Sequence, residues 1–278
     1  MTPRMLIAEW TDIFRRSGIP DPETDASVLL SSVTQRPPLN LRLDSDSVLD
    51  DISLERFRTL ADRRLSREPL QYILNETFFC GLSFYVDSRV LIPRPETELL
   101  CEWAESILAW YESPVLLDLC CGSGCLGITL KRRRPDASVF CSDISQDAIH
   151  VAEMNAARLH ADVHFLKGDL FAPVGQRRFH LIVSNPPYIP GTACLSLQPE
   201  VMCEPASALN GGPDGLNFYR RICREASGHL LTGGTLLMEL GDDESGDVRD
   251  MMHDAGFTDV EIRSDYQSLP RMISGMMI

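Results

Sequence analysis

The residues Ser184-Asn185-Pro186-Pro187-Tyr188 directly follow a short apolar run, Phe179-His180-Leu181-Ile182-Val183. An aliphatic run of this length, stopped by two prolines, predicts a buried parallel strand that ends in a rigid loop. Asn185 is therefore expected at the carboxyl end of a strand. In open α/β sheets, ligands bind at that end.

The loop carries groups that suit a planar amino group. The side-chain carbonyl of Asn185 and the backbone carbonyl of Pro186 can accept its two N–H bonds, and the ring of Tyr188 can stack on its plane. Pro186 removes a donor without removing an acceptor. A proline-stiffened turn with a polar tip is the alternative interpretation, and the loop alone does not decide between the two.

From Pro114 onward, strand and helix patterns alternate, which predicts an α/β fold with a doubly wound parallel sheet. A helix is expected at residues 248–255, and residues 257–263 and 272–277 are expected to form a closing antiparallel pair. The expected parallel strands are residues 115–119, 138–141, 163–166, 179–183 and 235–240.

The turn after the first of these strands reads Asp118-Leu119-Cys120-Cys121-Gly122-Ser123-Gly124. Its two glycines let the backbone approach a ligand closely, and the helix expected from Cys125 points its positive end at that ligand. Asp143 lies about 20 positions beyond Gly124, where dinucleotide-type folds hold a ribose hydroxyl with an acidic residue. The turn lacks the full G-x-G-x-x-G pattern, which favours adenosylmethionine over NAD as the nucleoside ligand.

Asp169 and Leu170 follow the third expected strand. Asp169 is placed to accept a hydrogen bond from the amino group of an adenine, and Leu170 to cover one face of the base. A polar turn followed by an apolar anchor explains each residue equally well.

The chain divides into three expected parts. Residues 1–75 show helical periodicity and predict a small helical bundle. Tyr72 to Pro95 is rich in β-forming residues, with turn candidates at Cys80-Gly81 and Asp87-Ser88, so residues 76–95 are expected as a linking β-hairpin. Residues 96–278 form the α/β domain.

Two segments of that domain are expected beside the site. Ile92-Pro93-Arg94-Pro95-Glu96-Thr97-Glu98 is held extended by its prolines before a helix begins, which suits a segment laid across the mouth of a site. Residues 189–217 show little periodicity and are expected as a substrate-facing loop. A group of acids is expected on a solvated face: Glu239, Asp242, Asp243, Glu244, Asp247 and Asp250.

Composition excludes several classes of function. The 278 residues carry a formal net charge of -14, which argues against a protein that grips nucleic acid with its whole surface. No apolar run reaches membrane length, and Met1 to Trp10 lacks the core of a signal peptide. Nine scattered cysteines indicate reduced thiols in the cytoplasm, and their spacing is not that of a zinc site, so no metal is expected.

Five groups of residues, taken together, resemble one family. In their arrangement the chain is similar to the bacterial N5-glutamine methyltransferases that modify peptide chain release factors. Asn-Pro-Pro-Tyr alone also occurs in adenine-N6 methyltransferases, so the Ile-Pro-Arg-Pro-Glu-Thr-Glu segment carries the discrimination. The matching groups are Arg67-x-Pro69 with Tyr72, then Leu91 to Glu98, Asp118 to Gly124, Asn185 to Tyr188, and Glu204-Pro205 with Gly211-Gly212 and Asp214-Gly215.

The resemblance implies a class I, Rossmann-like methyltransferase fold, S-adenosylmethionine as methyl donor, and class I release factors as protein partners. The acceptor it implies is the glutamine of a Gly-Gly-Gln motif, held by Asn185, Pro186, Pro187 and Tyr188, of which Asn185, Pro186 and Tyr188 are catalytic. The family usually has a glycine at position 120, so here the turn must accommodate the side chain of Cys120. The cofactor contacts fall on Cys120, Cys121, Gly122, Ser123, Gly124, Asp143, Asp169, Leu170 and Asn185.

Three other functions remain open at this point. An adenine-N6 methyltransferase would present the same kind of flat amino group but needs a basic track for nucleic acid. A glutamine of a ribosomal protein is a second possible acceptor. A cofactor-binding module that recognises a protein without catalysis is the third.

Overall fold

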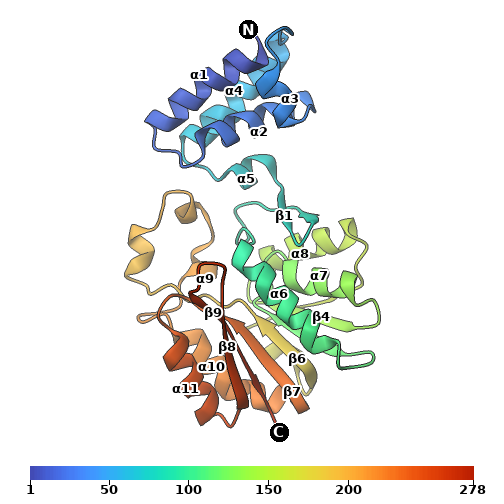
Figure 1. Ribbon diagram of the computed structural model, residues 1–278. Coiled ribbons are helices and arrows are strands. Elements are labelled where there is room, and N and C mark those ends of the chain that lie inside the picture. The colour runs from blue at the N-terminus through green and yellow to red at the C-terminus, as the bar shows by residue number, and fades with distance from the viewer. The chain divides into compact units, whose positions relative to one another are not determined.

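Residues 1–278 are all described by a computed structural model, in which the chain forms two units (Figure 1). Met1–Asn75 and Gln198–Cys203 make up the first unit, and Glu76–Leu197 and Glu204–Ile278 make up the second. The chain therefore leaves the second unit once, contributes a short segment to the first and returns. Residues 76–95 lie wholly within the second unit.

The first unit is helical, as its periodicity predicts. Leu6, Trp10 and Phe14 are buried on one face of the first helix. The ring of Trp10 packs edge-on against Phe14 and Phe57, with 5.6 Å between centroids in both pairs. Tyr72 lies in the fifth helix, so the expected β-rich stretch begins later than its composition indicates. The elements are α1 (Pro3–Arg16), α2 (Pro22–Thr34), α3 (Pro38–Leu43), α4 (Asp51–Leu65), α5 (Leu70–Leu74) and η3 (Val201–Cys203).

Arg64 is the centre of an ion-pair network in the first unit. Its guanidinium donates to Asp25 at 2.7 Å and to Glu200 at 2.9 Å, and Arg67 pairs with Glu200 at 2.7 Å. Burial raises the pKa of Glu200, but Arg67 and Arg64 outweigh it and hold that pKa at about 2. Arg64 and Asp25 are themselves buried, and a buried charge is tolerated only with a partner.

Arg64→Met is expected to destabilise the protein by about 3 kcal/mol or more, because Asp25 then keeps a buried charge without its partner. Arg15→Met is the matched control, since Arg15 pairs with Asp12 at the surface and exposed pairs contribute little. Urea denaturation followed by circular dichroism measures both losses. Equal losses in the two variants would contradict the role assigned to the network.

The second unit begins with a hairpin of β1 (Thr77–Phe79) and β2 (Leu82–Phe84). Cys80 and Gly81 form its turn with φ of 50° and 77°, the left-handed values that a two-residue hairpin turn requires. The second expected turn is present at Asp87, whose carbonyl accepts from the backbone N–H of Val90 at 3.1 Å. Residues 85–94 form no strand, so the expected β-rich stretch is also shorter than predicted.

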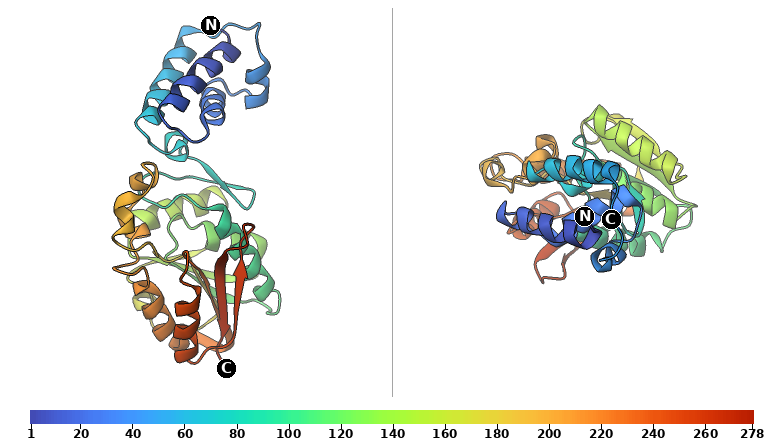
Figure 2. Two further views of the ribbon diagram at one scale, coloured as in Figure 1. Left: turned by 60° about the vertical axis from the view of Figure 1, so that its left-hand side comes forward. Right: turned by 90° about the horizontal axis from the view of Figure 1, so that it is seen from above.

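Seven strands form the central sheet in the order β5-β4-β3-β6-β7-β9-β8. Strands β3 to β7 pair in parallel, and β9 and β8 close one edge as an antiparallel pair, dark red in Figure 2. This topology confirms the predicted doubly wound fold. The strands are β3 (Val115–Leu119), β4 (Ser138–Asp143), β5 (His164–Lys167), β6 (Phe179–Ser184), β7 (Leu230–Glu239), β8 (Thr258–Ser264) and β9 (Pro270–Met276).

Helices cover both faces of this sheet. The long ones are α6 (Pro95–Leu108), α7 (Cys125–Arg133), α8 (Gln146–Arg158), α10 (Asn217–Ala226) and α11 (Ser245–Asp254). Figure 1 shows α6, α7 and α8 on one face and α10 and α11 on the other. In β6, Leu181 packs into the apolar core that includes residues of α6, α7 and α8, and Ile182 packs into the core that includes residues of α10 and α11. Because both faces are covered, the strands read as continuous apolar runs.

The expected elements leave residues 218–234 unassigned, but most of α10 lies there. Its buried residues Tyr219, Ile222, Cys223 and Ala226 recur at helical spacing, so the signal was present in the sequence. The segment before α10 has only short helical turns, η2 (Ala193–Ser196), η3 and α9 (Ala206–Leu209). Two further short helical turns lie elsewhere in this unit, η1 (Ala172–Val174) and η4 (Ser227–His229).

None of the helices combines the length and the apolar run that a membrane crossing requires.

Candidate active site

The site lies where the strand order reverses, between β3 and β6. The two strands pair in parallel with Leu119 opposite Ser184, so the chain leaves both at the same level. The hydroxyl of Ser184 donates to the carbonyl of Leu119 at 2.7 Å and holds these ends together. The glycine-rich turn after β3 and Asn185 after β6 therefore emerge side by side. Ligands of open α/β sheets bind in this crevice.

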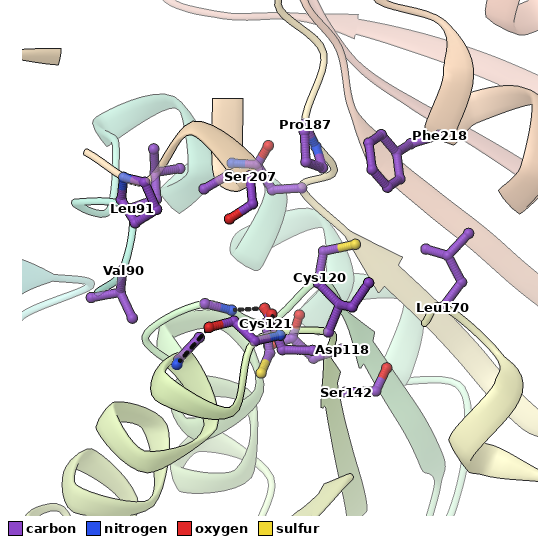
Figure 3. Close-up of a pocket in the computed structure, with 18 of the residues that line it drawn as sticks. Val90, Leu91, Asp118, Cys120, Cys121, Ser142, Leu170, Pro187, Ser207 and Phe218 are labelled. Carbon is purple, nitrogen blue, oxygen red and sulfur yellow. Dashed lines mark hydrogen bonds between the residues drawn. The ribbon is translucent and has the colours of Figure 1, made fainter. Parts of the chain in front are cut away.

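A cavity of about 850 Å³ opens at this point. Figure 3 shows Cys120, Cys121 and Asp118 on one side of it, and Pro187, Ser207 and Phe218 on the other. Of the residues predicted for the site, Gly124, Pro186 and Tyr188 do not line this cavity. Those that do are Cys120, Cys121, Gly122, Ser123, Asp143, Asp169, Leu170, Asn185 and Pro187.

The turn after β3 has left-handed backbone at Cys120, Gly122 and Gly124, with φ of 64°, 53° and 78°. A side chain at Gly124 would also crowd the neighbouring helices, since its Cβ would lie 2.8 Å from Cδ1 of Ile128. Cys120 carries a side chain in a conformation that costs a non-glycine residue about 1–2 kcal/mol. Cys120, which the resemblance implies replaces a glycine, thus lies at a strained position of the glycine-rich turn.

Asp143, at the end of β4, links this turn to the helix that follows. One carboxylate oxygen accepts from the N–H of Gly122 at 2.9 Å, and the other accepts from Ser145 at 2.9 Å. Each oxygen keeps a second lone pair, so a ligand hydroxyl can still bind there. Burial raises the pKa of Asp143, against the lowering effect of these backbone donors.

Two polar atoms in the wall of the cavity have no hydrogen-bond partner: Oδ1 of Asp118 and Oγ of Ser142. Asp118 is only 1% exposed, and its Oδ2 accepts from the N–H of Gly127 at 2.8 Å. Burial raises the pKa of Asp118 to about 7. Buried polar atoms in proteins are normally paired, so these two atoms in the cavity wall are candidates to pair with a polar ligand. The sequence pattern predicts Asp118 only as part of the turn, and its position next to the last residue of β3 is the signal that could have assigned it to the site.

Asp169 and Leu170 lie on the same side of the cavity as α10. Asp169 pairs with Arg221 of that helix at 2.7 Å and remains exposed. Leu170 is buried with φ of 45°, so its side chain is fixed in the wall. Both therefore lie where a base could contact them.

Tyr188 lines a second cavity, of about 640 Å³, together with Glu239 and Arg271. Asn185 and Pro187 of the same loop line the first cavity. The Asn-Pro-Pro-Tyr loop thus separates the two cavities. The side-chain amide of Asn185 faces the first cavity, and the ring of Tyr188 faces the second. Burial is the main cause that raises the pKa of Tyr188, so the phenol stays protonated.

Three glycines make room for Tyr188. A Cβ on Gly211 would lie 2.7 Å from the Cα of Tyr188, and one on Gly241 would lie 2.7 Å from its ring atom Cδ2. A Cβ on Gly215 would collide with its carbonyl oxygen. Gly211 also donates to the carbonyl of Ile189 at 2.8 Å, which pairs this segment with the loop. These three glycines, Gly211 and Gly215 in the long loop and Gly241 after β7, therefore form a cradle for Tyr188.

Glu204 joins the proline-rich segment before α6 to the long loop. Its Oε2 accepts from the N–H of Ile92 at 3.0 Å, and its Oε1 accepts from Arg94. Glu204 is buried, which raises its pKa, while Arg94 opposes that rise. Leu91, Pro93 and Pro205 line the first cavity, so this clamp forms part of its wall.

The expectation of a solvated acidic face is wrong for two of its members. Glu239 is 1% exposed and Glu244 is 8% exposed, while Asp242, Asp243, Asp247 and Asp250 are exposed as expected. Burial is the main cause that raises the pKa of both Glu239 and Glu244 to about 7. Glu239 is the last residue of β7, and its position at a carboxyl strand end was the signal that could have placed it at the site.

Glu239 takes part in a short chain of hydrogen bonds. The hydroxyl of Thr97 donates to its Oε2 at 2.6 Å, and Nδ2 of Asn185 donates to the oxygen of that hydroxyl at 3.2 Å. Thr97 lies in the first turn of α6 and is buried. The two ends of the chain, Asn185 and Glu239, lie at the carboxyl ends of the adjacent strands β6 and β7.

Comparisons with known proteins agree with this geometry. The family model "Methyltransferase small domain" matches residues 96–215, and "PrmC N-terminal domain" matches residues 5–74. The release factor glutamine methyltransferase of Geobacter sulfurreducens is 40% identical over 97% of this chain and 95% of its own length. That of Chlorobaculum tepidum is 41% identical over 95% of this chain and 93% of its own length.

A solved structure shares the fold. The T. thermophilus 16S rRNA methyltransferase, in complex with AdoMet and guanosine, aligns with a TM-score of 0.55 and 17% identity, covering 73% of this chain and 50% of its own. The parallel sheet, the glycine-rich turn and the Asn-Pro-Pro-Tyr loop at its switch point define a methyltransferase. Within that class, the chain belongs to the release factor glutamine methyltransferase family, because relatives of that name match nearly its whole length.

Gly211→Ala is expected to lower methyl transfer by about tenfold or more, because the new Cβ displaces Tyr188 and small displacements at a site are costly. Gly246→Ala is the matched control, since a Cβ there meets no atom within 4 Å. Initial rates with saturating donor, together with melting temperatures, measure both variants. Normal turnover in a correctly folded Gly211→Ala protein would show that the cradle does not matter.

Proposed function

We propose that the protein transfers a methyl group from S-adenosylmethionine to the side-chain amide nitrogen of the glutamine in the Gly-Gly-Gln motif of peptide chain release factors. The observation that carries this proposal is the position of Asn185. Its carboxamide lies on the wall of a cavity that also contains the unpaired atoms of Asp118 and Ser142. The side chain that would hold the glutamine amide and the atoms that would bind the cationic methyl donor therefore lie in one crevice.

The residues in the cavity suit S-adenosylmethionine. When bound, this donor supplies an electrophilic methyl group on a positively charged sulfur. Asp118 offers an unpaired carboxylate oxygen to a cationic ligand, and Asp143 can accept from a ribose hydroxyl. Leu170 and Asp169 are placed to cover and hydrogen-bond the base. The backbone turn from Cys120 to Gly124 lets the ligand approach the sheet closely.

For the acceptor, the main task of the protein is positioning. An amide nitrogen is a poor nucleophile because its lone pair is delocalised, so orientation has to bring it close to the methyl group. Oδ1 of Asn185 and the carbonyl of Pro186 accept the two N–H bonds of the glutamine amide. They would turn the nitrogen toward the methyl group of the donor, to the roughly 3 to 3.5 Å that direct transfer requires. The ring of Tyr188 lines the second cavity, on the other side of the loop from this amide. The chain needs no general base before transfer. The nitrogen–carbon bond would form as the carbon–sulfur bond of the donor breaks, S-adenosylhomocysteine would leave, and the methylated amide, now strongly acidic, would lose one N–H proton to water.

The first test uses a peptide that contains Gly-Gly-Gln, incubated with the protein and S-adenosylmethionine. Mass spectrometry is expected to find one added methyl group on the glutamine, and none when glutamine is replaced by asparagine. Asn185→Ala is expected to nearly abolish methylation, leaving a small residual rate, while donor binding, measured by calorimetry, stays largely intact. Methylation of an oligonucleotide or of a ribosomal-protein glutamine, with no methylation of a release factor, would overturn the choice of acceptor.

A second test concerns Asp118, whose pKa is raised to about 7 by burial. A cation beside it favours the ionised carboxylate, so donor binding releases a proton when the pH is below that pKa. Affinity for S-adenosylmethionine is therefore expected to rise by up to about tenfold per pH unit below pH 7 and to level off above it. Calorimetry between pH 5.5 and 8.5 measures the slope. Asp118→Asn is expected to flatten it, and an unchanged slope in that variant would exclude Asp118 as the titrating group.

A further inference from the structure

Three elements supply the hydrogen-bonded chain that ends on Asn185. Asn185 follows β6, Thr97 lies in the first turn of α6, and Glu239 ends β7. The distances are 3.2 Å from Nδ2 of Asn185 to Oγ1 of Thr97, and 2.6 Å from that oxygen to Oε2 of Glu239. Thr97 is 2% exposed and Glu239 is 1% exposed, so solvent competes little for these bonds.

The chemistry of the three groups decides which of them donates in each hydrogen bond. Above its raised pKa of about 7, the ionised carboxylate of Glu239 only accepts, so the hydroxyl of Thr97 gives its proton to that carboxylate. The lone pairs of that hydroxyl are then left to accept, and Asn185 must present its NH2 group to them. The two ends of a carboxamide have nearly the same shape, so only such partners decide which end faces the cavity.

We propose that Thr97 and Glu239 form a relay that fixes the carboxamide of Asn185 with its oxygen toward the acceptor, which makes both of them positioning residues for methyl transfer. This inference rests on the proposed function. With its oxygen directed at the acceptor, Asn185 can receive an N–H bond. A reversed carboxamide would place its own N–H bonds against those of the incoming amide, which is repulsive.

The relay also explains how the site distinguishes glutamine from glutamate. A glutamate carboxylate offers no N–H bond to the oxygen of Asn185, so a buried acceptor would be left unpaired. When ionised, the carboxylate of Glu239, two hydrogen bonds away from Asn185, adds electrostatic repulsion. The relay therefore selects an acceptor that carries an NH2 group.

The surroundings of Glu239 bear on its ionisation. Burial opposes the charged form, and hydrogen bonding from Thr97 and the positive charges of Arg271 and Arg94 favour it, while Glu96 opposes it. The hydroxyl of Tyr219 also donates to the backbone carbonyl of Glu239 at 2.9 Å, which fixes the strand end. The backbone of Glu239 is thus fixed by a contact that does not involve Asn185.

Substitutions at Thr97 separate the relay from simple packing. Thr97→Val keeps the shape and removes the hydroxyl, and is expected to lower kcat by about tenfold or more, with little change in donor affinity. Thr97→Ser restores the hydroxyl and is expected to recover most of the rate. Thr129→Val is the matched control, because the hydroxyl of Thr129 is equally buried but has no partner. A Thr97→Ser variant as slow as Thr97→Val would overturn the relay.

A double-mutant cycle tests whether Thr97 acts through Asn185. The variant Asn185→Ala with Thr97→Val is expected to be no slower than Asn185→Ala alone, since there is no carboxamide left to orient. Glu239→Gln is expected to lower kcat because a side-chain amide can donate to Thr97 and reverse the hydroxyl. Losses that simply multiply in the double variant would show that Thr97 acts independently of Asn185.

A spectroscopic readout keeps the inference separate from the choice of substrate. In the 15N-labelled full chain, the side-chain NH2 signals of Asn185 are assigned by their loss in Asn185→Ala. Their exchange with solvent is expected to be slow in the wild-type protein and faster in Thr97→Val, whether or not a Gly-Gly-Gln peptide is methylated. Equal exchange in both proteins would refute the relay, whereas slow exchange without any peptide methylation would refute only the proposed acceptor.

Discussion

The parallel pairing of β3 with β6 is the interaction on which the rest of the second unit depends. Leu119 lies opposite Ser184, and the hydroxyl of Ser184 bonds the carbonyl of Leu119, so both strands end at the same level. A shift by one residue would turn each side chain to the other face of the sheet. The glycine-rich turn and the Asn-Pro-Pro-Tyr loop would then no longer open into one cavity. Strand register therefore decides the geometry of the site before any polar contact does.

Around that junction the protein buries several carboxylates that a stable core alone would not need. Asp118, Glu204 and Glu239 all lie at or near the carboxyl edge of the sheet, and each is at most 6% exposed. Removing a carboxylate from water is unfavourable unless donors replace the lost hydration. The donors are a backbone N–H for Asp118, a backbone N–H with an arginine for Glu204, and a hydroxyl for Glu239. Polar groups of this kind concentrate where a protein binds and orients a ligand.

These contacts show why sequence motifs that lie far apart form one structure. Glu204 fastens the segment around Ile92 to the long loop, and the glycines of that loop leave space for Tyr188. The same segment continues into α6, whose first turn supplies Thr97 to the site. Asn185 bonds Thr97 of the first segment, and Ile189, the residue after the Asn-Pro-Pro-Tyr loop, bonds Gly211 of the long loop. The first unit is connected to this arrangement by the chain itself, since Gln198–Cys203 of the long loop belongs to it.

The sequence by itself determined the order and type of most elements, the glycine-rich turn and the position of Asn185, because strand periods, prolines and glycines act on their own neighbourhood. It also identified the family, through motifs that are local strings. Only the tertiary structure decided that Glu239 is buried, that Thr97 is its partner, and that the loop separates Asn185 from the cavity of Tyr188. A run of acidic residues predicts a solvent-exposed face when the donors that would compensate a buried carboxylate lie far away in the sequence. Which remote donor meets a buried carboxylate depends on packing, and packing is absent from local patterns.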